Sequence, residues 1–272
     1  MRKLLIALLL LSTALSGISS AETGVKKRRP LPFEYGRVVM DSHPGNEWMA
    51  PVVFDHWLHR SFYTCRVCHV DIGFAMKAGE TGVSEDDNIA GYYCGACHNG
   101  KMEFNGRKVF AACSKTPLKE DSSRCERCHS QGRSGIERDY EFAEFTKSFP
   151  KGRFGNGIDW DKADEQGLIK PSDFVEGISI KRDSLKVQKD FSLVPKVAGM
   201  PQIIFSHKKH TVWAGCELCH PEIFIGVKKG ATKYSMVEIF DGKYCGACHG
   251  KVAFPLTDCQ RCHAEPVGQG QP

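Results

Sequence analysis

The chain has 272 residues, thirteen cysteines and a formal net charge of +5. An odd number of cysteines does not fit a framework in which every cysteine forms a disulfide. The positive charge does not indicate nucleic-acid binding, because Arg2 and Lys3 lie in an expected leader and the basic run Lys26–Arg29 is local.

Residues 1–21 have the pattern of a cleaved secretory leader, with a basic start, an apolar stretch and small residues ending at Ala21. The apolar stretch is shorter than the roughly 20 residues that a membrane span needs. No cysteine follows it to carry a lipid anchor. We therefore expect a mature chain without a membrane span, exported to the periplasm, with release outside the cell as the alternative. Residues 22–48 are then an N-terminal extension.

Six copies of Cys-x-x-Cys-His follow along the chain and use 12 of the 13 cysteines and 6 of the 11 histidines. This is the attachment pattern of c-type haem, in which two thiols form thioethers and the adjacent imidazole binds one face of the iron. One copy could be half of a structural zinc site, but six exact copies make zinc the less favoured alternative. We expect six covalently bound haem c groups, held by Cys65, Cys68 and His69; Cys94, Cys97 and His98; Cys125, Cys128 and His129; Cys216, Cys219 and His220; Cys245, Cys248 and His249; and Cys259, Cys262 and His263.

The thirteenth cysteine, Cys113, has no histidine after it. We expect it to be a buried thiol, with a free reactive thiol or an intermolecular disulfide as the alternatives.

The motifs form two groups of three, and the groups are copies. A shift of 151 residues superposes Met49–His98 on Met200–His249 with 19 of 50 positions identical. We expect two modules, residues 49–133 (module one) and 200–272 (module two), joined by a connector over residues 134–199. With about 42 residues per haem, little chain is left for an ordinary core. We expect short α-helices after several motifs, and a mostly irregular chain that coats the haems.

Each module resembles the triheme cytochromes of the c7 class, relatives of cytochrome c3. The resemblance is carried by Phe-x-His-x-x-His at Phe54–His59 and Phe205–His210, by the central YCGACH, and by a third Cys-x-x-Cys-His. It implies a multihaem cytochrome fold made of two c7-like triheme modules in tandem. It also implies an electron carrier of anaerobic or extracellular respiration. The partners would be other redox proteins as donor and acceptor, with extracellular metal oxides as a candidate acceptor.

Five histidines remain for the second axial position of six irons. The resemblance implies that the first histidine of each His-x-x-His pair serves the first haem and the second serves the second haem. Related tandem modules often take a methionine before the middle motif as the ligand of the third haem, which implies that Met236 pairs with His263. The implied histidine pairs are His56 with His69, His59 with His98, His207 with His220, and His210 with His249.

The third haem of module one departs from this pattern. Glu85 stands where module two has Met236, and a carboxylate is a poor ligand for a low-spin haem. His43 has no counterpart in module two, so we expect it to complete the His129 haem. Met76 and Met102 are the alternatives, and an open iron is the last one.

An iron with two protein ligands moves electrons but offers no position to a substrate. We therefore expect an electron carrier without catalytic residues, and not an enzyme. The alternatives are a reductase acting at an open His129 haem and a protomer of an extracellular haem filament. Six haems with ionised propionates would make the mature chain roughly −3 when oxidised, so no nucleic-acid partner is expected.

Overall fold

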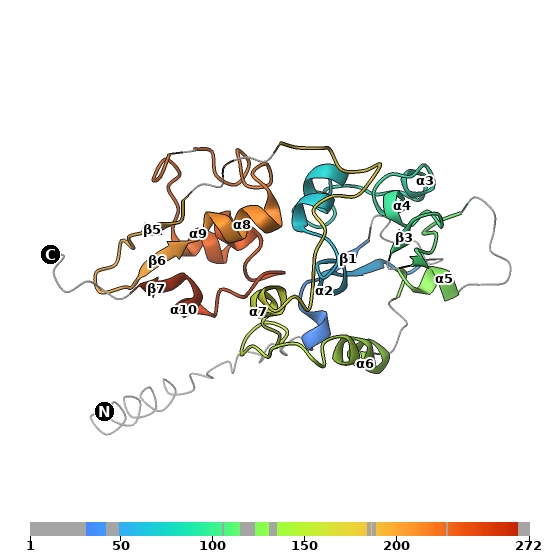
Figure 1. Cartoon of the computed structure of the whole chain (residues 1–272), viewed down its shortest axis with the longest axis horizontal. Coiled ribbons are helices and arrows are strands. Elements are labelled where there is room, and N and C mark those ends of the chain that lie inside the picture. The colour runs from blue at the N-terminus through green and yellow to red at the C-terminus, as the bar shows by residue number, and fades with distance from the viewer. Residues whose placement is uncertain are drawn as a thin grey trace, which may run out of the picture. The chain divides into compact units, whose positions relative to one another are not determined.

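The computed structural model describes residues 31–41, 49–104, 106–114, 123–130, 135–183, 186, 189–226 and 228–265 (Figure 1). The expected leader and His43 lie outside these residues. Within these ranges, no helix has the length and apolar character needed to cross a membrane.

The first group of motifs lies among short elements. Strands β1 (Arg37–Met40) and β2 (Val52–Asp55) form an antiparallel pair, with Val38 opposite Phe54. The other elements of this part are the helices η1 (Pro32–Glu34), α2 (His56–His59), η2 (Val67–Ile72), α3 (Glu85–Ile89), α4 (Cys94–Cys97) and α5 (Ser123–Glu126), and the strands β3 (Glu103–Phe104) and β4 (Arg107–Lys108).

The second group repeats this plan. Strands β5 (Phe191–Leu193), β6 (Gln202–Phe205) and β7 (His263–Glu265) form one antiparallel sheet in that order (Figure 1). β6 runs directly towards helix α8, as β2 runs into α2, so each His-x-x-His pair lies on a helix at the end of a strand. The helices of this part are α8 (His207–Ala214), α9 (Met236–Phe240), η3 (Tyr244–Ala247) and α10 (Cys259–Cys262).

The two copies use the same local devices around the middle motif. Ser84 caps α3 in a capping box with Asp87, and Ser235 caps α9 in the same way with Glu238. A Cβ added to Gly95 would lie 1.9 Å from the Asn88 carbonyl oxygen, and on Gly246 it would lie 1.8 Å from that of Ile239. Only glycine therefore lets the motif pack against the preceding helix.

Some of the helices lie on the motifs and not after them. We expected them after the motifs, but α4 and α10 coincide with Cys-x-x-Cys itself, and η2 begins inside its motif. Residues three apart on a helix share one face, so a helical turn directs both thiols to the same side. The described helices are short, as expected, and the longest is α6 (Gly135–Phe145), with 11 residues.

The connector holds an apolar core that was not expected. Phe142, Phe149, Ile158, Trp160, Ala163 and Ile169 from the connector form one buried cluster with Phe33 and Trp57. Trp57 packs edge-to-face on Phe142 at 5.2 Å between ring centroids. The expectation that little ordinary core would form is thus wrong for this part, because α6 and α7 (Trp160–Glu165) supply large aromatic side chains.

Candidate haem sites

Three of the four expected histidine pairs are brought together. The ring centroids are 6.5 Å apart in His56–His69, 6.2 Å in His59–His98 and 6.1 Å in His210–His249. Metal–imidazole bonds are about 2 Å long, so two imidazoles on opposite faces of one iron have centroids about 6 Å apart. Each of these pairs has the spacing that one shared iron requires.

The fourth expected pair is not brought together. His207 has its ring against Phe191 and Phe205, with centroids 5.2 and 5.0 Å away. The His220 ring lies 6.3 Å from that of Phe224. Among the ring contacts of the described residues, none joins His207 to His220, and the pairing stays a prediction.

Most histidines have the tautomer that a ligand needs. Nδ1 lies within hydrogen-bond distance of a backbone carbonyl oxygen in eight of the ten described histidines. A carbonyl only accepts, so Nδ1 carries the proton and Nε2 keeps its lone pair for a metal. These hydrogen bonds join His56 to Gly36, His69 to Phe74, His129 to Ala50, His207 to Lys189, His210 to Ser206, His220 to Phe224, His249 to Phe254 and His263 to Pro201, over 2.5 to 3.1 Å.

The other two histidines, His59 and His98, have a buried Nδ1 without a hydrogen bond of ordinary geometry. Burial, and after it the nearby His98, lower the pKa of His59 to about 4. Burial likewise lowers the pKa of His56 to about 4. These imidazoles are therefore neutral at neutral pH, which is the form that binds iron.

The third motif of each module is anchored at matched positions. His129 Nδ1 donates to the Ala50 carbonyl over 2.5 Å, and His263 Nδ1 donates to the Pro201 carbonyl over 2.9 Å. A shift of 151 residues carries Ala50 onto Pro201. The repeat therefore extends to this haem, although the chain before the motif differs in length.

The second ligands expected for these two haems are Met236 in module two and His43 in module one. Met236 begins α9 and its side chain is 43% exposed, while Glu85 begins α3 at the matched place. His43 lies outside the described residues. The alternatives Met76 and Met102 are both half-buried.

The residues fit haem better than zinc. Within the described ranges, no group of three or more histidine, cysteine, aspartate or glutamate side chains is placed to hold a metal ion. Large apolar side chains near the motifs are exposed, among them Tyr92 at 64% and Phe240 at 59%. Such surface is typical of a site that a large apolar group covers.

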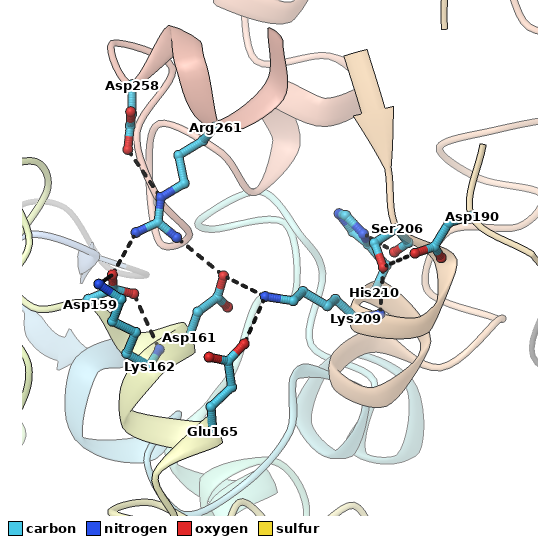
Figure 2. Close-up of polar contacts among 10 residues, drawn as sticks. All are labelled: Asp159, Asp161, Lys162, Glu165, Asp190, Ser206, Lys209, His210, Asp258 and Arg261. Carbon is cyan, nitrogen blue, oxygen red and sulfur yellow. Dashed lines mark hydrogen bonds and ion pairs between the residues drawn. The ribbon is translucent and has the colours of Figure 1, made fainter. Parts of the chain in front are cut away.

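A charged network surrounds the last motif (Figure 2). Arg261, between Cys259 and Cys262, pairs with Asp159 at 3.1 Å and with Asp161 at 3.2 Å. The network extends to Lys209, between His207 and His210, which pairs with Asp161 at 3.3 Å and with Glu165 at 3.2 Å. Helix α7 of the connector therefore contacts both the last Cys-x-x-Cys-His motif and the His-x-x-His helix of module two. The sequence contains no signal for these pairs, since the partners are 44 to 102 residues apart.

Cys113 is half-buried, and burial is the main cause that raises the pKa of its thiol. Glu85 and Cys128 raise it further, so the thiol lies near the third motif of module one.

The structure also reveals a matched pair of rings that sequence reasoning missed. Phe110 lies 4.5 Å from the His98 ring, and Phe254 lies 4.3 Å from that of His249.

One comparison with known proteins shows a family. A search of the curated proteins found no match. A solved c7-type three-heme cytochrome domain is 38% identical to this chain, with coverage of 28% of this chain and 93% of that one and a TM-score of 0.26. The C-terminal hexaheme fragment of GSU1996 is 25% identical, with coverage of 87% and 98% and a TM-score of 0.25. The dodecaheme cytochrome c GSU1996 is 23% identical, with coverage of 85% and 75% and a TM-score of 0.26.

Because these TM-scores are low, the assignment rests on the family model. The model described as cytochrome c7 and related cytochrome c matches residues 52–130 and 203–264, together just over half of the 272 residues. The chain therefore belongs to this family, and it is a multihaem c-type cytochrome.

Proposed function

We propose that this chain is an exported hexahaem cytochrome that carries electrons one at a time between redox proteins of anaerobic or extracellular respiration. The observation that supports it best is the spacing of about 6 Å in three histidine pairs. Two imidazoles per iron leave no axial position for a substrate, whereas they permit electron transfer through the haem.

Bound haem would supply the one-electron chemistry, and the residues of the chain hold and tune it. The two cysteines of each motif anchor the ring, and the adjacent histidine binds the iron. The hydrogen bonds from Nδ1 to carbonyl oxygens fix the orientation of the imidazoles. We propose module boundaries at residues 49–133 and 200–272, with strand β5 of the connector completing module two, export to the periplasm, and donor and acceptor proteins as the partners.

One observation keeps a second candidate function open. Glu85 stands where module two has Met236 at the start of the matched helix. The His129 haem therefore needs another second ligand, with His43 expected, Met76 or Met102 as alternatives, and an open iron as the last alternative. An open iron at His129 would make the protein a reductase.

The two functions differ in their response to small substrates. The fully reduced protein should deliver six electrons to a ferric acceptor in a stopped-flow experiment, and it should not turn over nitrite or hydroxylamine. Turnover of either substrate, at a rate that changes in the variant His129→Met, would favour the reductase. Mass spectrometry of the same sample should show six haems on a chain that starts at Glu22.

A further inference from the structure

The first motif of module one lies against the first motif of module two. Arg66, between Cys65 and Cys68, is buried, and its side chain packs on Gly215, the residue before Cys216. A Cβ built on Gly215 would lie 2.5 Å from Arg66 Cδ. A side chain at position 215 would therefore displace Arg66, and glycine allows the two motif backbones to approach each other.

An arginine of the connector bridges the same two motifs. Arg182 Nη1 lies 2.7 Å from Asp71 Oδ1, and Arg182 Nε lies 2.6 Å from Glu217 Oε1. Asp71 follows His69 by two residues and its side chain is fully buried, while Glu217 lies between Cys216 and Cys219. A buried carboxylate needs a charged partner, so this bridge resists opening and fixes the spacing of the two motifs.

The third motif of module one makes its contacts within its own module. The Cys128 carbonyl accepts from the Val53 amide over 2.8 Å. His129 donates to Ala50 over 2.5 Å, and Arg127 lies 4.8 Å from the centroid of the Phe110 ring. Sequence order would make this motif the neighbour of Cys216, but the contacts give that place to the motif of Cys65 and Cys68.

We propose that electrons cross between the modules from the haem of His69 to the haem of His220, so that the electron route does not follow the order of the motifs in the sequence. The inference rests on the proposed electron-carrier function. In the step, ferrous iron at His69 is oxidised to ferric iron and ferric iron at His220 is reduced to ferrous iron. One electron moves, and no bond is made or broken. The haem of His129 is then an end of the route, open to exchange with a partner.

The test uses the full-length protein with its haems and the variant His56→Met. Methionine ligation raises the reduction potential, so the haem of His69 should be reduced first. Its added electron should make neighbouring haems harder to reduce. We would follow the methyl resonances of each haem by NMR during stepwise reduction. We expect the apparent reduction potential of the His220 haem to fall, and to fall by at least as much as that of the His98 haem.

The matched control is His59→Met, which changes the second histidine of the same His-x-x-His sequence. It should raise the potential of the His98 haem and leave the His220 haem unchanged. No shift at the His220 haem in His56→Met, or a larger shift at the His249 haem, would overturn the proposed route.

A second set of variants does not alter the ligands. Arg182→Gln should weaken the effect that reduction of the His69 haem has on the potential of the His220 haem. Arg182→Lys should retain part of this effect. Lys147→Gln, which breaks an exposed ion pair with Glu144, should have no effect. An unchanged interaction in Arg182→Gln would contradict the bridging role. These outcomes concern only the route, whereas high-spin iron with substrate turnover in the parent protein would contradict the electron-carrier function itself.

Discussion

A histidine side chain offers iron only one of its two ring nitrogens, and the backbone decides which one. In this chain the carbonyls that accept from Nδ1 come from near and far positions. Phe74 lies five residues after His69, whereas Pro201 lies 62 residues before His263. The ligand types follow from the motifs, but the orientation of the third haem in each module depends on distant backbone.

Met236 is the residue whose role is most open to test. A thioether favours ferrous iron, so ligation by Met236 would make the His263 haem the most oxidising of module two. We expect Met236→His to lower one potential in a redox titration and to remove any weak ferric sulfur-to-iron absorption band. An unchanged spectrum and unchanged potentials would show that Met236 only packs.

The glycine of the middle motif should be intolerant of change. Gly246→Ala places a Cβ 1.8 Å from the Ile239 carbonyl oxygen, where the backbone of α9 must move. Overpacking of this kind costs about 1–3 kcal/mol in the free energy of unfolding, measured by chemical denaturation. The control is Gly79→Ala, whose Cβ would meet nothing within 4 Å and which bears only the strain of its φ of +86°. Equal losses in the two variants would contradict the packing argument.

Strands and helices outside the expected modules complete the haem sites. Strand β5 pairs with β6, and the backbone carbonyl of Lys189, just before β5, accepts a hydrogen bond from His207. Both lie in the connector, ahead of the expected boundary at residue 200. The gapless repeat placed that boundary at Met200, because identity begins there and the pairing of β5 leaves no trace in the motif spacing.

A shortened protein tests this boundary. A fragment of residues 186–272 keeps β5, whereas a fragment of residues 200–272 loses it together with the partner of His207. We expect the longer fragment to mature with three haems and the shorter one to show high-spin iron at the His220 haem in its absorption spectrum. Low-spin iron at all three haems of the shorter fragment would show that β5 is dispensable.

The connector core should contribute most of the stability that does not depend on haem. Phe149 is buried between Phe145 and Trp160, at 5.5 and 5.7 Å between ring centroids. Phe149→Ala should cost about 3–5 kcal/mol in the free energy of unfolding, measured by chemical denaturation. Tyr140→Ala, at a side chain that is 68% exposed, should cost much less. A loss from Phe149→Ala no greater than that control would mean that the cluster is not a core.

At the scale of the whole chain, sequence reasoning found what is local and missed what is distant. Cys-x-x-Cys-His and His-x-x-His are complete within six residues, so the motifs and their tandem repeat could be predicted. The connector core and the packing of Arg66 on Gly215 depend on segments that meet only after folding. No spacing in the sequence records them.

The central claim is that each iron has two protein ligands, and the low-temperature electron paramagnetic resonance spectrum of the oxidised protein tests it most directly. We predict six low-spin ferric haems in the parent protein and one high-spin haem in His43→Ala. A high-spin ferric signal in the parent protein, at one haem or more, would contradict the account and favour a reductase.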